Sequence, residues 1–444
     1  MEGSICTSTL QEMEQRFLSQ SRNRVAMNAA VSCGVLQAAM SCQAPRETRH
    51  TFSVSLKQGD ITNQKQSGRC WMFAALNTMR FQVMQKLGLK TFELSQAYPL
   101  FYDKLEKSNY FLENILKTLE EPTEGRLIAW LLTAPLGDGG QWDMFVALVE
   151  KYGVVPKDAM PESVSSSATA QLNAAMTEKL REDACILRTA HQSGAAMEEL
   201  RTMKAAMLEE IYRMECIALG TPPTRFTFEV RNDKDEFIRD ADITPQEFYQ
   251  KYVGLDLSQY VSLINAPTQD KPFNRTYTVK FLGNVLEGRQ VKYLNLTAQE
   301  LKEAAIAQLQ AGEPVWFGSD VGKRSVRDTG LMDLNAVDLE GLFDVKFGMD
   351  KGQRLEYGQS LMTHAMVLQG VNLDENGKPN RWRVENSWGK EPGHEGYYVM
   401  SDDWFTEYTY QVVVNKKYLT EAQRQLWEQE PLELEPWDPM GSLA

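Results

Sequence analysis

Cys70 has the sequence surroundings of a nucleophile. It follows Gly68-Arg69 and opens an apolar run that continues to Leu87 and stops at Gly88. This run predicts a helix of about five turns with Cys70 at its N-terminus. Unpaired N–H groups and the helix dipole at that end favour an anion, which lowers the pKa of a thiol. Cys70 is therefore a candidate nucleophile for acyl transfer.

Acyl transfer by sulfur also needs a general base, a group that orients the base, and donors for the oxyanion. His364 begins an apolar run that predicts a buried strand, and Asn386 lies at the end of a later predicted strand. Gln64 precedes Cys70, so its side-chain amide and the Cys70 backbone N–H are candidate oxyanion donors. Each residue alone has an ordinary explanation, such as a core histidine or a turn-forming asparagine. The set of four predicts a Cys-His-Asn mechanism.

The elements that must position these residues differ between the two halves of the chain. Helical patterns precede residue 224, and strand-like patterns follow it. Helices are expected at 8–43, 70–87, 92–135, 143–152, 170–217 and 301–309. Strands are expected at 226–230, 277–281, 290–296, 314–318, 365–371, 381–386, 397–400 and 411–414. This order predicts an α+β fold with a helical lobe and a β-rich lobe.

Composition narrows the class of protein. The 444 residues, 43% hydrophobic and 24% charged, are typical of a globular protein with two or three units. The net charge of −13 makes nucleic-acid binding unlikely. No apolar run reaches the roughly 20 residues that span a bilayer, and the N-terminus lacks a signal-peptide pattern, so we expect a cytoplasmic protein. The other cysteines are expected to be packing residues: Cys6, Cys33, Cys42, Cys185 and Cys216.

Three separated blocks resemble the signatures of papain-like cysteine peptidases. They are Gln64-x5-Cys70-Trp71, Thr363-His364-Ala365 and Asn386-Ser387-Trp388-Gly389. The long separation of Cys70 from His364 departs from secreted papains. Segments 63–73, 106–109, 137–142 and 383–388 are instead similar to the bleomycin hydrolase and aminopeptidase C branch, with bacterial aminopeptidase C nearest. The likeness runs along essentially the whole chain.

The resemblance implies a papain-like core with a large helical insertion. It divides the chain into an N-terminal segment with the helical left lobe (1–164), a mainly helical insertion for oligomerisation (165–260), a β-rich right lobe (261–427) and a C-terminal tail (428–444). It also implies a homohexamer whose active sites face an internal channel. Gly139 and Gly140 would lie on the cleft wall, and they and Trp388 would bind substrate. Trp388 could also shield the bond between His364 and Asn386 from water. No metal or organic cofactor is needed.

The tail 428–444 has prolines at 431, 436 and 439, which predict an extended chain. By composition alone it also fits a disordered acidic tail. The resemblance implies instead that the tail lies in the cleft, where the Ala444 carboxylate would meet the α-ammonium of the substrate. The enzyme would then remove N-terminal residues from peptides with a free N-terminus.

Alternatives remain at two points. A transglutaminase-like or amidase reaction would share the catalytic residues but needs a cleft open at both ends. A non-catalytic shell or nucleic-acid-binding ring is disfavoured by the intact set of four residues and by the negative charge. In the helical stretch 170–217, the stripe Leu200, Met203, Met207, Ile211 and Met214 fits either a buried core or a subunit interface.

Overall fold

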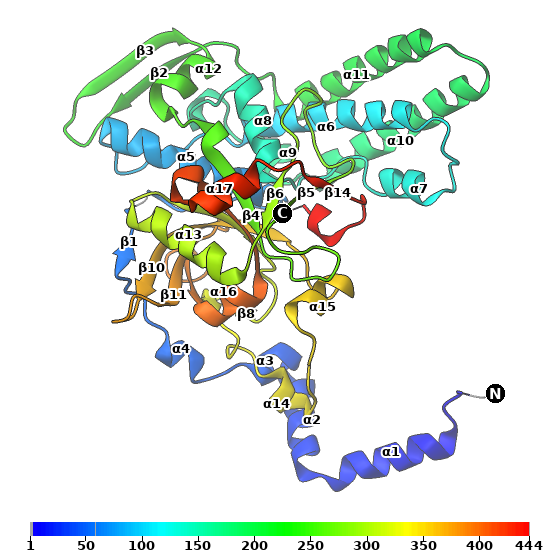
Figure 1. Ribbon diagram of the computed structural model, residues 1–444, viewed down its shortest axis with the longest axis vertical. Helices are drawn as coiled ribbons and strands as arrows, with labels where there is room; N and C mark the ends of the chain where they lie inside the picture. Colours follow the sequence, from blue (N-terminus) through cyan, green and yellow to red (C-terminus); the bar gives the residue numbers. More distant parts are fainter. Residues whose placement is uncertain (1–2, 58, 444) are drawn as a thin grey trace.

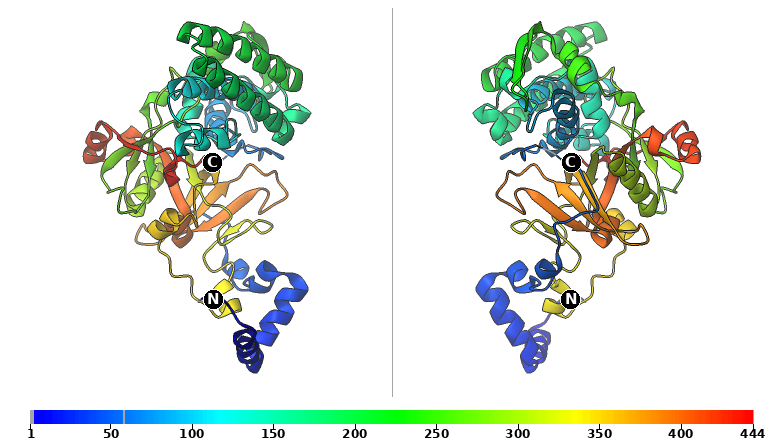
Figure 2. Two further views of the ribbon diagram at one scale, coloured as in Figure 1. Left: turned by 90° about the vertical axis from the view of Figure 1, so that its right-hand side faces the viewer. Right: turned by 90° about the vertical axis from the view of Figure 1, so that its left-hand side faces the viewer.

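The computed structural model describes residues 3–57 and 59–443. A helical lobe lies against one side of a large β-sheet, and an N-terminal arm of helices projects from the opposite end of the molecule (Figure 1). The side views in Figure 2 show the same three parts in the same order. The predicted α+β class is confirmed.

The helical lobe is built around α5, Cys70–Leu87, which confirms the predicted helix of about five turns that ends before Gly88. Gly88 ends this helix in the left-handed conformation, at φ +68°. The single helical stretch expected at 92–135 is wrong, because a turn that includes Pro122 and Gly125 divides it. The remaining helices of this lobe are α6 (Ala97–Lys117), α7 (Arg126–Thr133), α8 (Trp142–Tyr152) and α9 (Val164–Ser167).

Two long helices, α10 (Ala170–Gln192) and α11 (Met197–Leu219), pack against α6 and against each other. On α11, Leu200, Met207 and Ile211 are buried, and Met203 and Met214 pack half-buried on the same core. The stripe is therefore core-facing. A hairpin of β2 (Phe226–Arg231) and β3 (Phe237–Ile243) follows, with α12 at Pro245–Phe248; β3 was not expected from the sequence.

The large sheet is mostly antiparallel and has the order β14-β5-β6-β4-β13-β7-β10-β11-β12-β9-β8, with β1 beside β10. Its first strands are β1 (Val54–Ser55), β4 (Tyr260–Ile264), β5 (Arg275–Val279), β6 (Tyr293–Asn295) and β7 (Val315–Ser319). The later strands are β8 (Ser325–Val326), β9 (Leu331–Met332), β10 (His364–Leu373), β11 (Pro379–Glu385), β12 (Tyr397–Ser401), β13 (Thr409–Asn415) and β14 (Leu432–Leu434). Its accompanying helices are α13 (Ala298–Gln310), α15 (Lys351–Glu356), α16 (Asp402–Tyr408) and α17 (Glu421–Trp427).

The two lobes meet through buried aromatic side chains. The Trp316 indole N–H of β7 donates to the Trp71 carbonyl of α5 at 3.1 Å. The rings of Trp142 and Trp316 lie 6.2 Å apart. This contact places the N-terminus of α5 against the sheet at β7 and β10.

The N-terminal arm consists of α1 (Thr7–Ser19), α2 (Ser21–Cys33), α3 (Val35–Ala39) and α4 (Ala44–Glu47), with α14 (Leu339–Phe343) beside it. No residue of α1 or α2 is buried. The prediction that five cysteines serve packing is wrong for Cys6, Cys33, Cys42 and Cys185, which are exposed. Cys216 is half-buried and packs against the core, as expected. Within the described residues, every helix is too short or too polar to cross a membrane.

Candidate active site

The two lobes bring Cys70 and His364 to one place. Cys70 is the first residue of α5, and His364 is the first residue of β10, paired with Ser319 of β7. The Cys70 thiol lies against the backbone of Ala365, the residue after His364. Both side chains are buried, with Cys70 2% and His364 5% exposed. The predicted nucleophile therefore lies beside the start of the strand that carries the predicted base, where the lobes join.

Asn386 follows β11 and holds the imidazole by one nitrogen. His364 Nε2 lies 2.8 Å from Asn386 Oδ1. Because Oδ1 only accepts hydrogen bonds, Nε2 carries a proton, and Nδ1 of the neutral ring is left as an acceptor. The Trp388 ring lies 4.8 Å from the imidazole and covers this pair. His364, Asn386 and Trp388 thus lie together, as the sequence predicted.

Burial favours the neutral forms of both reacting groups. It raises the pKa of the Cys70 thiol to about 11, although nearby backbone groups of Ala365 and Trp71 act in the opposite direction. It lowers the pKa of His364 to about 4, partly offset by the hydrogen bond to Asn386. At neutral pH the imidazole is therefore free to accept the thiol proton.

Gln64 is held at both ends of its amide. Its Nε2 donates to the Ser67 carbonyl at 2.6 Å, and its Oε1 accepts from Ser387 Oγ at 2.6 Å. Since Nε2 carries two hydrogens, one remains for an oxyanion beside the Cys70 backbone N–H. The Ser387 contact also ties Gln64 to the residue after Asn386, so both lobes fix the amide.

Two charged side chains near Cys70 were missed by the sequence analysis. Arg69 is fully buried and makes a bidentate ion pair with Glu162, at 3.0 and 2.9 Å. Asp138 accepts from the Gly68 N–H at 2.8 Å and from Lys104 Nζ at 2.6 Å. In a sequence, an isolated Arg or Asp is normally interpreted as a surface charge. Only the Gly-Asp-Gly-Gly turn around Asp138 could have indicated its role.

Asp138 also connects the start of α10 to the loop before Cys70. Its carboxylate accepts from Asn173 Nδ2 at 2.8 Å and from Thr169 Oγ1. Burial alone would raise the pKa of this carboxyl, but the Lys104 ammonium and the other donors hold it well below its usual range. The carboxylate is therefore a fixed negative charge that aligns Gly68.

Gly139 and Gly140 form a loop against the base of α5. A Cβ at Gly140 would lie 2.6 Å from the Trp71 ring, so this position has no room for a side chain. The Gly139 carbonyl accepts from Lys107 Nζ at 2.6 Å. The two glycines thus lie beside the residue after the nucleophile, and a role in binding substrate stays a prediction.

The C-terminal tail is ordered and crosses between the lobes. Its strand β14 pairs in parallel with β5, and a single 3₁₀ turn follows at Pro439–Gly441. The Ser442 carbonyl accepts from Gln141 Nε2 at 2.6 Å, and Ser442 Oγ donates to the Met362 carbonyl at 2.8 Å. The largely extended path agrees with the prolines, and the disordered-tail alternative is wrong. Ala444 lies outside the described residues.

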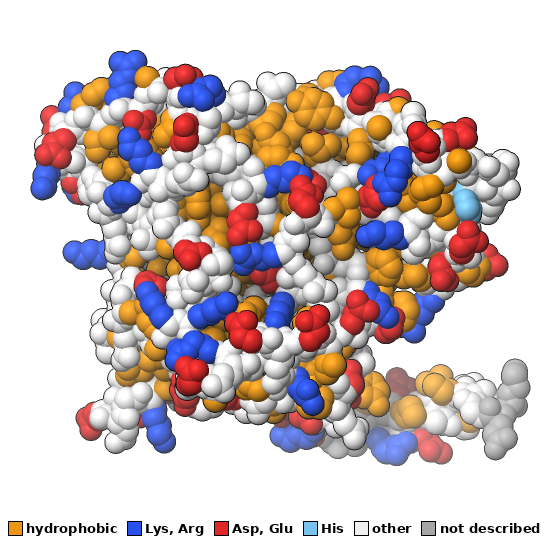
Figure 3. Space-filling view, turned by 45° about the horizontal axis from the view of Figure 1, so that its top comes forward, with side chains coloured by type: hydrophobic (Ala, Val, Ile, Leu, Met, Phe, Trp, Pro, Cys, Tyr) orange, Lys and Arg blue, Asp and Glu red, His pale blue; other side chains and the backbone are white. Residues whose placement is uncertain are grey.

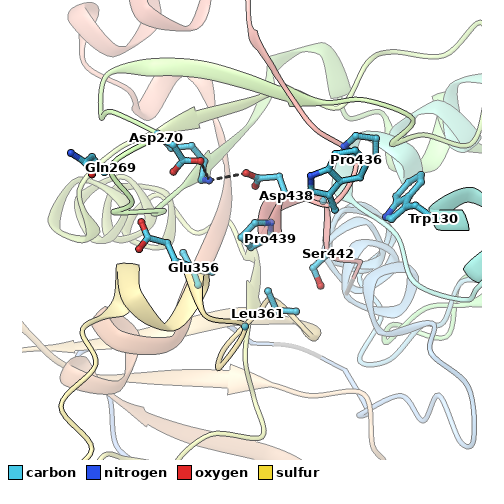
Figure 4. Close-up of a pocket in the computed structure, with 14 residues that line it drawn as sticks. Trp130, Gln269, Asp270, Glu356, Leu361, Pro436, Asp438, Pro439 and Ser442 are labelled. Carbon is cyan, nitrogen blue, oxygen red and sulfur yellow. Dashed lines mark hydrogen bonds and ion pairs between the residues drawn. The ribbon is translucent and has the colours of Figure 1, made fainter. Parts of the chain in front are cut away.

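A cavity of about 940 Å³ lies along the tail (Figure 4). Pro436, Asp438 and Ser442 of the tail line one part of it, and Trp130 of α7 lies beside them (Figure 4). Lys271, only 2% exposed, pairs with Asp438 at 2.8 Å and so fixes the tail to the β-rich lobe. The remaining lining residues are Gln269, Asp270, Leu355, Glu356, Gly358, Leu361, Trp437, Pro439 and Gly441.

Known proteins resemble this chain over its full length. Residues 4–441 match the Peptidase C1-like family. Aminopeptidase C of Listeria monocytogenes is 53% identical over 88% of each chain, and bleomycin hydrolase of Homo sapiens is 42% identical over 97% of this chain and 96% of its own. The solved structure of pepw from Lactobacillus rhamnosis is 48% identical, covers 100% of both chains and has a TM-score of 0.98. The papain-like resemblance is confirmed, and the chain belongs to the Peptidase C1-like family.

Proposed function

We propose that this chain is a cytoplasmic thiol aminopeptidase that removes N-terminal residues from peptides. The names of its relatives, aminopeptidase C and bleomycin hydrolase, support the activity. The observation that carries the proposal is the position of Ser442, which bonds to Gln141 on one lobe and to Met362 on the other. By joining the two lobes, the tail at Ser442 supports a cleft that is blocked on this side.

The proposed reaction begins with transfer of the Cys70 proton to Nδ1 of His364 as sulfur attacks the carbonyl carbon. The oxyanion accepts hydrogen bonds from the Cys70 backbone N–H and from Gln64 Nε2. The imidazolium, oriented through Nε2 by Asn386, then protonates the leaving nitrogen, and the C–N bond breaks. Water attacks the thioester with His364 as base, which releases the amino acid and restores the thiol.

Specificity for a free N-terminus follows from charge at the closed end of the cleft. We propose that the terminal carboxylate of Ala444 binds the substrate's α-ammonium, as an ion pair with hydrogen bonds. An N-acetylated substrate has neither the positive charge nor the space. The same blocked end disfavours the transglutaminase-like alternative, which needs a cleft open at both ends.

The test compares free with N-acetylated aminoacyl amides in the full chain and in a chain lacking Leu443 and Ala444. The full chain should hydrolyse the free substrate only, and alkylation of Cys70 should abolish this activity. The truncated chain should lose at least tenfold in the preference for the free amine, because a charge-assisted hydrogen bond stabilises by about 1.5–3 kcal/mol. An unchanged preference would refute the role of the tail, while no hydrolysis by the full chain would refute the peptidase.

We further propose that the chain forms a homohexamer, in which the insertion 165–260 and the N-terminal arm contact other copies. Exposed apolar residues on α11, such as Met197 and Ile217, support this role. On the face drawn in Figure 3, Lys and Arg are interspersed with Asp and Glu. That mixture supports a protein partner over a nucleic acid for this face.

A further inference from the structure

Arg327 lies against the tryptophan that covers the candidate base. Its guanidinium carbon is 4.8 Å from the centre of the Trp388 ring. The Trp388 ring in turn lies 4.8 Å from the His364 ring. Arg327, in the loop after β8, and the imidazole of His364 therefore contact the same indole.

The Arg327 side chain is exposed and has no carboxylate partner among the described residues. Two other cations of the same lobe, Lys390 and Arg383, do have partners. Lys390 Nζ pairs with Asp60 at 2.5 Å, and the Arg383 guanidinium donates to the Leu56 carbonyl at 3.1 Å. The adjacent Asp328 uses its backbone carbonyl to accept from Gly393. The guanidinium N–H groups of Arg327 therefore remain available to an external acceptor.

The direction of the substrate places its leaving group on this side. The tail, through Ser442, occupies the cleft near Gln141 and Met362. The leaving nitrogen must lie at His364 to receive its proton, so the rest of the leaving peptide runs away from the tail and past the imidazole. An extended chain spans about 3.5 Å per residue, so one or two residues reach from His364 across Trp388.

We propose that Arg327 binds the free C-terminal carboxylate of a short leaving group, and that the enzyme thereby favours dipeptides and tripeptides. This inference rests on the proposed aminopeptidase function. A guanidinium matches a carboxylate with two parallel N–H groups. Stacking on Trp388 restrains the guanidinium plane while leaving its edge free to donate.

The test measures kcat/KM for peptides of one N-terminal residue followed by Gly or Gly-Gly, each with a free C-terminal carboxylate and as the C-terminal amide. The quantity compared is the kcat/KM of the peptide with a free carboxylate divided by the kcat/KM of the corresponding amide. The full chain is compared with Arg327→Gln, Arg327→Lys and the control Lys390→Gln. The control removes a positive charge that lies two residues after Trp388 in sequence and already has a partner, Asp60.

The full chain should favour the carboxylate, and Arg327→Gln should lower the ratio about threefold to tenfold, between the effects of an exposed ion pair and a charge-assisted hydrogen bond. Arg327→Lys should keep part of the preference, and Lys390→Gln should keep the ratio of the full chain. Raising the salt from about 0.05 to 0.5 M should lower the ratio of the full chain, because screening weakens exposed charge pairs.

Equal ratios in the full chain and Arg327→Gln would overturn the carboxylate subsite while leaving the aminopeptidase intact. A purely structural role in holding Trp388 would reduce kcat/KM for carboxylate and amide alike, and would also overturn it. Failure of the full chain to cleave any of the four peptides would instead refute the proposed function.

Discussion

At the scale of single residues, burial keeps the two candidate reacting groups uncharged before any reaction starts. Burial raises the pKa of Cys70 to about 11 and lowers that of His364 to about 4. Each group alone stays neutral at pH 7, and only proton transfer between them yields a thiolate beside an imidazolium. The proposed nucleophile, Cys70, should therefore depend on its proposed base, His364, more than the helix N-terminus alone would suggest.

Replacing His364 by Gln should make alkylation of Cys70 strongly pH dependent. With a thiol pKa of about 11, the thiolate fraction at pH 7 is about 10⁻⁴, and it rises tenfold with each pH unit up to the pKa. Iodoacetamide should therefore react slowly with the variant at pH 7 and much faster at pH 10. In the full chain, His364 accepts the thiol proton as sulfur attacks, and the imidazolium stabilises the developing sulfur anion, so the full chain should react faster than the variant at pH 7. Similar rates for both proteins at pH 7 would contradict this role of His364.

Gln64 should contribute to the rate more than to binding. Gln64→Ala removes an oxyanion donor and should lower kcat about 10²–10³-fold with little change in KM. Ser387→Ala keeps the amide but removes the 2.6 Å contact that orients it, so a smaller loss is expected. Steady-state kinetics on a free aminoacyl amide measure both. A larger loss in Ser387→Ala than in Gln64→Ala would contradict the assignment.

At the scale of elements, the sequence predicted the helices and strands that are marked by a local run of apolar residues. The apolar run that ends at Gly88 defined α5, and the run after His364 indicated β10. Sequence did not reveal the contacts of Asp138, because its partners Gly68 and Asn173 are 70 and 35 residues away. The proposed catalytic residues were identified through sequence motifs, whereas the contacts that support them arise only from the packing of distant elements.

Asp138→Asn should weaken the link between α10 and the loop before Cys70. It leaves the fully buried Lys104 without its anionic partner, so we expect a loss of about 3 kcal/mol in the free energy of unfolding and a lower kcat. Urea denaturation and steady-state kinetics measure the two effects.

Thr169→Val is the matched control, since it removes one donor to Asp138 but keeps the ion pair with Lys104. It should lower kcat with a smaller loss of stability. The double variant Asp138→Asn with Lys104→Gln should recover part of the stability, because no buried charge is left unpaired. Stability of Asp138→Asn equal to that of the full chain would contradict the role of the ion pair.

At the scale of the whole molecule, the N-terminal arm differs from the rest of the chain in how many of its apolar side chains are exposed. Apolar side chains of α2 and α3 are exposed, with Val31 at 82% and Leu36 at 65%. Met27 and Phe343 line an apolar hollow of about 350 Å³ between α2 and α14. Contiguous apolar surface of this kind is typical of an interface between subunits. The proposed active-site groups, in contrast, all come from one chain.

Val31→Asp with Leu36→Asp should therefore dissociate the proposed hexamer without removing any proposed catalytic group. Two carboxylates in an apolar contact lose hydration without gaining a partner, so the variant should sediment as a single chain of 50.5 kDa. Arg24→Glu, an exposed change on the same helix, is the control for altered charge and should keep the mass of the full chain. The dissociated variant should still hydrolyse free aminoacyl amides, because Cys70, His364 and the tail belong to the same chain.

A full chain that already sediments at 50.5 kDa would refute the hexamer. An unchanged mass in the double variant would show that the arm does not hold the copies together.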